Sequence, residues 1–158
     1  MFSLIAAVGK NRELGNKGGL VFQIKEDMQF FKETTMGHPV IMGLNTFNSL
    51  PHALPGRKNY VLTRHPEELP DGVFPVTDLD KFIAENQGSD EEIFVIGGAY
   101  VYSEMLPHCN TLYLTEIDAS AEADVFFPEF DKAKYDKIIL KKGQSHDLVY
   151  SFAKYIKK

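Results

Sequence analysis

Asp27 lies in a segment, residues 24–35, whose apolar residues have helical spacing. At about 100° per residue, Asp27 falls on the same face as Ile24, Met28 and Phe31. A carboxylate on the inward face of a helix costs desolvation energy unless a partner binds it. Two interpretations stay open: a tilted helix whose carboxylate reaches water at the rim, or a buried carboxylate with a raised pKa. The second would suit binding of a protonatable heterocycle.

Three predicted strands end in residues that suit anion binding. Residues 92–96 run into Gly97 and Gly98, while 43–46 (Gly43-Leu44-Asn45-Thr46) and 63–65 (Thr63-Arg64-His65) follow two other apolar runs. Glycine lets the backbone approach a ligand closely, and a helix N-terminus attracts anions. In the second run, Asn45 or Thr46 would cap a helix or bind a phosphate. Ligands of parallel sheets bind at the carboxyl ends of the strands, so the three ends predict one extended, multiply phosphorylated ligand.

The known phosphate-binding motifs are absent, since the chain has neither G-x-G-x-x-G nor G-x-x-x-x-G-K-[ST]. Only three of the 17 basic residues are arginine, and Arg57 and Arg64 lie in one segment. A planar guanidinium binds carboxylates and phosphates through paired hydrogen bonds. Two solvated surface charges are the alternative. The polar, glycine-rich residues 9–19 are read either as a functional lid or as a plain surface loop.

Other common site chemistries find no support in the sequence. The histidines and the single cysteine, Cys109, show no metal-ligand spacing, and there is no G-x-S-x-G elbow. We therefore expect no metal and no serine-hydrolase chemistry. The five histidines are His38, His52, His65, His108 and His146.

The elements that must hold these residues alternate between strands and helices. Strands are predicted over residues 2–8, 39–42, 59–63, 92–96 and 111–117, near 73–74, and as an antiparallel pair over 136–141 and 148–155. Helices are predicted over residues 24–35, 45–50, 79–85 and 100–106. The alternation indicates βαβ units and therefore an α/β fold with a largely parallel sheet.

Length and composition limit the partners and the compartment. A chain of 158 residues predicts one domain. Its 17 basic and 22 acidic residues, a net charge of −5, argue against nucleic acid or anionic lipid as a partner. The apolar N-terminal stretch, residues 1–8, is too short to span a membrane. A single cysteine fits a reducing compartment, so we expect a cytoplasmic protein.

Taken in order, the motifs resemble dihydrofolate reductases of the bacterial chromosomal type over nearly the whole chain. Each matching segment alone is weak, whereas the ordered set is specific. The C-terminal strands match in pattern more than in identity. The matching segments are residues 3–7; Asp27 with Phe31-Lys32 and Thr35; 39–43; Thr46-Phe47 with Ser49-Leu50; 54–59; 93–98 with Val101-Tyr102; 112–118; and Asp124 with Phe127-Pro128.

The resemblance implies a fold and an activity. The fold would be a single domain over residues 1–158, with a central, mostly parallel eight-stranded sheet, an antiparallel C-terminal strand and about four flanking helices. An adenosine-binding subdomain would lie near residues 39–88. The activity would be reduction of 7,8-dihydrofolate to 5,6,7,8-tetrahydrofolate by hydride transfer from NADPH, which supplies one-carbon metabolism. The resemblance also implies a monomer, and inhibition by antifolates such as methotrexate or trimethoprim.

The resemblance assigns the substrate-binding residues one by one. Asp27 would bind the pterin amino group and ring nitrogen and favour protonation of the reacting imine. Thr115 would support the same polar end through a water, and Arg57 would bind the glutamate α-carboxylate in a bidentate manner. The substrate-binding residues would be Ile5, Ala6, Ala7, Asp27, Met28, Phe31, Leu50, Leu54, Arg57, Ile96 and Tyr102.

By the same resemblance, the strand ends and the lid would hold NADPH. The peptide between Gly97 and Gly98 would be cis, and residues 9–23 would close over the two rings and exclude water. The cofactor-binding residues would be Ala7, Leu14, Gly15, Gly19, Leu20, Gly43, Leu44, Asn45, Thr46, Leu62, Thr63, Arg64, His65, Ile96, Gly97, Gly98, Ala99, Tyr100, Val101 and Tyr102.

Several positions depart from the family pattern. They are Val21-Phe22 in place of Pro-Trp, Ala99 in place of glycine, and Leu44 and Tyr100 in place of arginines. The site thus has two cations fewer near the cofactor phosphates. Arg64, with help from Thr63 and His65, would have to recognise the 2′-phosphate.

Two other functions stay open from the sequence. One is a related pyrimidine reductase of riboflavin synthesis, and the other is a non-catalytic folate or nucleotide binder. Asp27 and Arg57 in their motifs disfavour the pyrimidine reductase, whose substrate has no glutamate tail. They also disfavour the non-catalytic binder, although a binder could retain both residues.

Overall fold

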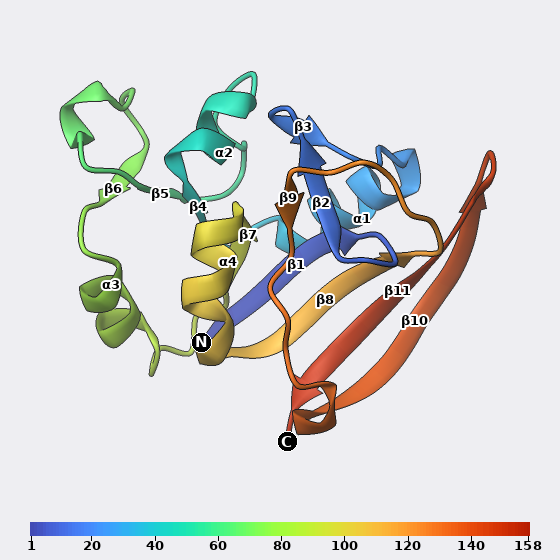
Figure 1. The fold of residues 1–158 in the computed structure, drawn as a ribbon. Helices are drawn as coiled ribbons and strands as arrows, with labels where there is room; N and C mark the ends of the chain where they lie inside the picture. Colours follow the sequence, from blue (N-terminus) through green and yellow to red (C-terminus); the bar gives the residue numbers. More distant parts are fainter.

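One eight-stranded sheet forms the centre of the structure, a computed structural model that describes residues 1–158 (Figure 1). Its strands are β1 (Phe2–Val8), β4 (Val40–Gly43), β5 (Asn59–Leu62), β6 (Phe74–Val76), β7 (Ile93–Gly97), β8 (Cys109–Ile117), β10 (Tyr135–Ser145) and β11 (Leu148–Lys157). They lie in the order β10-β11-β8-β1-β7-β4-β5-β6. Every neighbouring pair from β8 to β6 is parallel, whereas β11 pairs antiparallel with β8 and with β10. The predicted mostly parallel sheet with an antiparallel C-terminal end is confirmed.

Four α-helices cover the two faces of this sheet, in agreement with the sequence. They are α1 (Lys25–Thr35), α2 (Leu44–Ser49), α3 (Leu79–Asn86) and α4 (Ala99–Met105), and single 3-10 turns occur at η1 (Pro66–Glu68), η2 (Leu106–His108) and η3 (Lys132–Lys134). Aromatic side chains of α1 and α2 pack on the face that carries Ile5, whereas α3 and α4 pack on the face that carries Leu4. In Figure 1, α4 lies in front of the sheet and α1 behind it.

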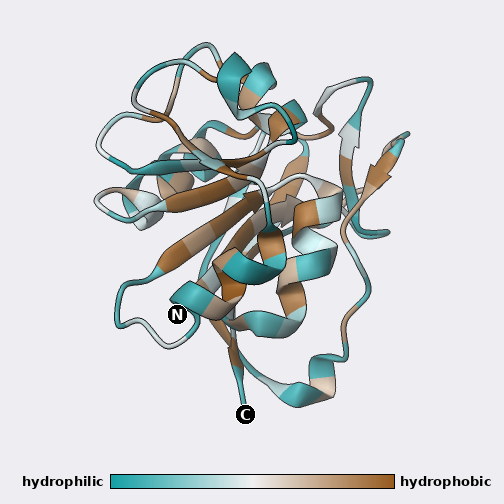
Figure 2. Cartoon of the chain, turned by 90° about the vertical axis from the view of Figure 1, so that its left-hand side faces the viewer, coloured by the Kyte–Doolittle hydropathy of each residue, from teal (hydrophilic) through white to brown (hydrophobic).

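The central position of β1 follows from its near-continuous apolar run. Successive side chains of a strand point to opposite faces, so Leu4 and Ile5 enter different hydrophobic clusters. Both faces of β1 are therefore buried, as a parallel strand between helical layers requires. Figure 2 shows the hydrophobic residues concentrated along the central strands, with hydrophilic residues on the outer turns of the helices.

The glycine-rich segment after β1 differs from the predicted irregular loop. It contains β2 (Glu13–Asn16) and β3 (Gly19–Leu20), which form a small three-stranded sheet with β9 (Val125–Phe126). The β2–β3 turn has positive φ angles at Lys17 (52°) and Gly18 (82°). Two central residues with positive φ are typical of the tight turns that join hairpin strands. The strands escaped prediction because they are short and lack apolar alternation.

The remaining element boundaries differ from the sequence prediction by a few residues. The stop signal after α1 is confirmed, since Gly37 has a φ of 80° just beyond the C-cap residue Met36. The C-terminal pair is longer than predicted and continues to Ser145 in β10 and to Lys157 in β11. No helix in the structure has the length and apolar character needed to cross a membrane.

Candidate active site

A hydrogen bond joins Asp27 and Thr115 on the face of the sheet that α1 covers. Asp27 lies in the first turn of α1, and Thr115 lies on β8, opposite Ala7 of β1. Thr115 Oγ1 donates directly to Asp27 Oδ1 over 2.5 Å. Burial raises the pKa of Asp27, and the Thr115 hydrogen bond opposes that rise. Asp27 is half-buried, so of the two interpretations left open by the sequence the structure favours the inward carboxylate with a raised pKa.

Apolar side chains from four elements pack together on the face of the sheet that carries Ile5. Ile5 is 4% exposed and belongs to a cluster with half-buried residues from α1, the end of α2, the following loop and β7. Half-buried apolar side chains leave area that a bound ring would remove from water. These partners of Ile5 are Phe31, Leu50, Leu54 and Ile96, all of which the sequence assigned to substrate.

Two of the assigned apolar residues lie differently from the expectation. Ala6 packs with the cluster under α4, because strand alternation turns its side chain away from Asp27. Met28 is 60% exposed, so it is not an inward residue of α1 in this structure. Ala7 lies on the Asp27 side, in a cluster that also contains Phe22.

Arg57 is fixed in place at the far end of α1. Its Nη1 donates to Thr35 Oγ1 over 3.0 Å, and its Nε donates to the Pro55 carbonyl over 2.9 Å. The side chain of Asn59 bonds to the backbone of Leu54 and of Arg57, which orders this loop. Partial burial lowers the pKa of Arg57, but a guanidinium stays cationic at neutral pH. No carboxylate lies within ion-pair distance of Arg57, so its charge is free to bind an anionic ligand.

The three predicted anion-binding strand ends lie side by side. They follow β7, β4 and β5, which are adjacent and parallel in the sheet. The Gly97–Gly98 peptide is cis, as expected. A Cβ on Gly98 would lie 3.3 Å from Thr46 Oγ1, so glycine leaves space that a side chain would fill. The ends of these strands thus form one backbone-rich edge.

The role expected of Asn45 or Thr46 as a helix cap is wrong. Both lie inside α2, whose N-cap residue is Gly43, because the helix begins at Leu44. Gly43 and Gly98 make no side-chain capping bond at the start of α2 and of α4. The first backbone N–H groups of these helices therefore have no side-chain partner and suit a phosphate.

Three of the residues assigned to the cofactor, Val101, Tyr102 and Thr63, are buried in the protein itself. Val101 and Tyr102 are 1% and 5% exposed, and the Tyr102 hydroxyl donates to the Ile5 carbonyl over 2.8 Å. The Thr63 hydroxyl accepts from the His65 N–H over 3.0 Å. Ala99 forms the first turn of α4 next to these residues. Their contribution to binding is therefore mainly shape and backbone.

A groove of about 760 Å³ adjoins the end of β5. It brings together six assigned residues, Leu44, Leu62, Thr63, Arg64, His65 and Tyr100. It also contains residues that the sequence reasoning missed, which are Thr77, Asp78, Leu79, Asp80 and Glu104. Glu104 raises the pKa of Tyr100 and lies beside the position where the family has an arginine. The groove is therefore less positive than a phosphate site with two further arginines.

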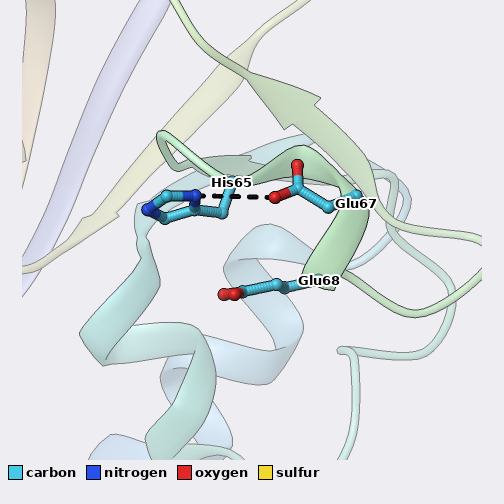
Figure 3. A group of neighbouring side chains, drawn as sticks. All are labelled: His65, Glu67 and Glu68. Atoms are coloured by element: carbon cyan, nitrogen blue, oxygen red, sulfur yellow. Dashed lines mark ion pairs between the residues drawn. The ribbon is translucent and has the colours of Figure 1, made fainter.

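The imidazole of His65 faces acidic neighbours, as Figure 3 shows. Its Nδ1 lies 3.5 Å from Glu67 Oε1, and the potential ligand atoms of His65, Glu67 and Glu68 all lie within 4.8 Å of one another. All three side chains are exposed. The carboxylates offset the positive charge that a protonated His65 would offer to an anion. Arg64 is therefore the one cation of this strand end without an acidic partner.

The segment expected to act as a lid is closed onto the loop that follows β8. The Asp124 N–H donates to the Gly15 carbonyl over 3.0 Å, and the Lys17 N–H donates to Asp124 Oδ2 over 3.0 Å. Leu20, on β3, is 62% exposed, whereas Leu14 packs with the cluster under α4. Gly19 is exposed at the hairpin turn.

Glu13 holds the same segment and gave no signal in the sequence. The residue is 2% exposed, and its carboxylate accepts from the Asn11 N–H over 2.7 Å and from the Ala121 N–H over 2.8 Å. Burial acts to raise the pKa of Glu13, but the backbone hydrogen bonds prevail and lower it. A single glutamate in a polar stretch looks like any surface residue, so only the folded contacts reveal it.

Comparison with known proteins finds the same family that the sequence motifs resemble. A family model described as dihydrofolate reductase matches residues 1–157. The chain is 37% identical over 161 aligned residues to a dihydrofolate reductase of Bacillus subtilis (strain 168), covering 100% of this chain and 95% of that protein. It is 36% identical to one of Neisseria gonorrhoeae, covering 99% and 98%. A solved structure, dihydrofolate reductase from Enterococcus faecalis complexed with NADP(H) and RAB-propyl, has a TM-score of 0.89 at 28% identity, covering 99% of this chain and 96% of that one.

Proposed function

The chain belongs to the dihydrofolate reductase family, and on this premise we propose how its residues reduce 7,8-dihydrofolate to 5,6,7,8-tetrahydrofolate. The observation that carries the proposal is the 2.5 Å hydrogen bond from Thr115 to the half-buried Asp27, beside apolar residues that suit a ring. A carboxylate held in this way recognises a cationic or amino-substituted heterocycle.

The reaction saturates one carbon–nitrogen double bond of the pterin. A hydride with its electron pair is added to the carbon, and a proton is added to the nitrogen. Bound NADPH supplies the hydride. Asp27 accepts hydrogen bonds from the amino group and ring nitrogen of the pterin and stabilises positive charge on the ring, which favours the protonated imine. Thr115 orients the carboxylate, and its hydrogen bond opposes the rise in the pKa of Asp27 that burial causes.

Arg57 binds the α-carboxylate of the folate glutamate. Its guanidinium is oriented by Thr35 and by the Pro55 carbonyl, so little side-chain entropy remains to be lost on binding. This assignment supports dihydrofolate over the substrate of a pyrimidine reductase, which has no such carboxylate. The half-buried apolar residues around Ile5 contact the rings between these two ends.

The residues at the strand ends fit NADPH. The space beside Gly98 and the uncapped starts of α2 and α4 suit the phosphates, and the groove with Arg64 suits the adenosine 2′-phosphate. We assign residues 39–88 to an adenosine-binding subdomain, since most of the groove lies there. Closure of the segment containing Gly15 and Leu20 excludes water from the reacting rings.

The enzyme acts as a monomer in the cytoplasm under this proposal. One chain supplies all the groups invoked above. The buried thiol of Cys109, whose pKa is raised to about 12 by burial, has no disulfide partner, which suits a reducing compartment. The antifolates methotrexate and trimethoprim, which carry amino-substituted rings, are expected to compete with dihydrofolate at Asp27.

The proposal is tested by following NADPH absorbance with purified protein. We expect oxidation of NADPH only after dihydrofolate is added, with formation of tetrahydrofolate in equal amount. An aminopyrimidine substrate of riboflavin synthesis serves as the second arm and should give no oxidation. Oxidation of NADPH with the aminopyrimidine but not with dihydrofolate would assign the chain to the pyrimidine reductases. Binding of dihydrofolate and NADPH without oxidation would support a non-catalytic binder.

A further inference from the structure

Glu26, the residue before Asp27, is held by two side chains of the C-terminal hairpin. The Tyr150 hydroxyl donates to Glu26 Oε1 over 2.6 Å, and Lys141 Nζ donates to Glu26 Oε2 over 2.5 Å. Tyr150 is 3% exposed, whereas the Lys141 side chain is 64% exposed. Exposed ion pairs add little because water screens them, so Tyr150 is the partner that fixes the position of Glu26.

The first turn of α1 has no side-chain cap of its own. Ile24 occupies the N-cap position and makes no capping hydrogen bond. The turn is instead attached through successive residues, Glu26 to Tyr150 of β11 and Asp27 to Thr115 of β8. β11 and β8 are adjacent strands, so both contacts attach the helix to the same sheet. If the contact between Glu26 and Tyr150 is lost, only the Thr115 hydrogen bond and apolar packing remain to hold the first turn of α1.

The hairpin also leaves a space that fits this contact. A Cβ on Gly143 would lie 2.5 Å from Tyr150 Cε2 and 2.6 Å from Glu26 Oε1. Such distances are well below van der Waals contact, so any larger residue would displace the ring or the carboxylate. Gly143 therefore permits the close approach of Tyr150 and Glu26.

We propose that Tyr150, acting through Glu26, is a positioning residue that fixes the first turn of α1 so that the Asp27 carboxylate meets the substrate ring. The inference rests on the role of Asp27 in the proposed function. The contact between Tyr150 and Glu26 needs a protonated hydroxyl and an ionised carboxylate near neutral pH. Lys141 and Tyr150 lower the pKa of Glu26, and Glu26 raises the pKa of Tyr150 to about 12.

The opposite face of the sheet supplies a matched control. The Tyr155 hydroxyl donates to Glu116 Oε2 over 2.5 Å, and Lys137 Nζ lies 2.7 Å from Glu116 Oε1. Tyr155 is 1% exposed and packs with the cluster under α3 and α4, away from Asp27. The same three residue types form this second contact, with the tyrosine again on β11 and the lysine again on β10, but its glutamate lies on β8 and not on α1.

The experiment compares Tyr150→Phe with Tyr155→Phe and with Asp27→Asn. The readouts are kcat and KM for dihydrofolate, the dissociation constants of trimethoprim and NADPH, and the thermal midpoint. We expect Tyr150→Phe to lower kcat and weaken trimethoprim about 5- to 30-fold, with NADPH affinity unchanged. Tyr155→Phe should lower the thermal midpoint and leave all kinetic and binding constants unchanged. In the Asp27→Asn background, Tyr150→Phe should have no further effect on trimethoprim.

The outcomes separate the inference from the function on which it rests. Wild-type kcat and trimethoprim affinity in Tyr150→Phe, with a large loss in Asp27→Asn, would overturn the positioning role alone. No loss in Asp27→Asn would overturn the proposed role of Asp27 itself. If Tyr150→Phe fails to fold, the positioning role is tested from the Glu26 side with the variants Glu26→Ala and Glu26→Gln. The alanine variant should show the same losses, and the glutamine variant, which keeps an acceptor for Tyr150, should recover most of them.

Discussion

The hydroxyl of Thr115 lies 2.5 Å from the carboxylate of Asp27, although 88 positions separate the two residues in the chain. The contact joins the helix α1 to the central strand β8. It places a hydrogen-bond donor on a carboxylate whose pKa burial raises. The Thr115 hydrogen bond therefore favours the ionised carboxylate, which is the form that binds a protonated pterin.

Thr115→Val should shift the pH profile of dihydrofolate reduction. The threonine hydroxyl stabilises the ionised form of Asp27, so its removal raises the pKa of that carboxyl further. We expect the acid limb of kcat/KM to move to higher pH. At neutral pH, kcat/KM should fall roughly 10-fold or more, the equivalent of losing one hydrogen bond to a charged group. A shift toward lower pH would contradict this role of Thr115.

Arg57→Ala should weaken dihydrofolate binding and leave NADPH binding unchanged. Hydrogen bonds to charged groups contribute about 1.5–3 kcal/mol, so we expect KM for dihydrofolate to rise roughly 10- to 100-fold. Thr35→Val should give a smaller loss in the same direction, because Thr35 Oγ1 orients the guanidinium. Equilibrium binding of each ligand is the measurement. Equal losses for both ligands would place Arg57 elsewhere in the reaction.

Glu13→Gln should destabilise the lid in a pH-dependent manner. The folded-state pKa of Glu13 is lowered below its ordinary value of 4.5, so its carboxylate adds stability above that pH. The contribution is lost as the pH falls through the folded pKa. We expect Glu13→Gln to be less stable than the wild type by about 1–3 kcal/mol at pH 7 and nearly equal to it in acid. Denaturant unfolding at several pH values measures the difference, and a gap that widens in acid would be the opposite result.

The preference for NADPH over NADH should rest largely on Arg64. Leu44 and Tyr100 supply no charge, and acidic side chains such as Glu104 share the groove. One partly solvated arginine contributes about 1.5–3 kcal/mol to a phosphate contact, so we expect a preference of roughly ten- to a few hundred-fold. It should shrink with added salt and in Arg64→Ala, and grow in Leu44→Arg.

The measurement for this prediction is the ratio of kcat/KM for NADPH to that for NADH. Wild type, Arg64→Ala and Leu44→Arg are compared in the same buffer. An unchanged ratio in Arg64→Ala would mean that another residue recognises the 2′-phosphate.

The sequence predicted the parts of the site that depend on periodicity and on strand order. A buried apolar run must be central, and helical spacing placed Asp27 on the inner side of α1. The ends of β4, β5 and β7 met at one edge because parallel strands share their direction. Their residues were therefore brought together as expected.

Contacts between distant polar residues were beyond sequence reasoning. Glu13 and Glu26 have ordinary surface surroundings in the sequence, and their partners are set by the fold. The strands β2 and β3 were missed for a related reason, since their pairing with each other and with β9, not an apolar pattern, defines them. Met28 was misplaced because helical periodicity gives an angle but not the depth at which a side chain is covered.

The role of Asp27 is tested by the kcat/KM for dihydrofolate of the Asp27→Asn variant at neutral pH. The substitution removes the charge and keeps the shape, and truncating half of a buried charged pair costs about 3–5 kcal/mol. We predict a loss of roughly 10²- to 10³-fold, partly recovered as the pH falls, with NADPH affinity and the fold intact. Wild-type activity at neutral pH in a folded Asp27→Asn protein would show that this carboxylate does not activate the pterin.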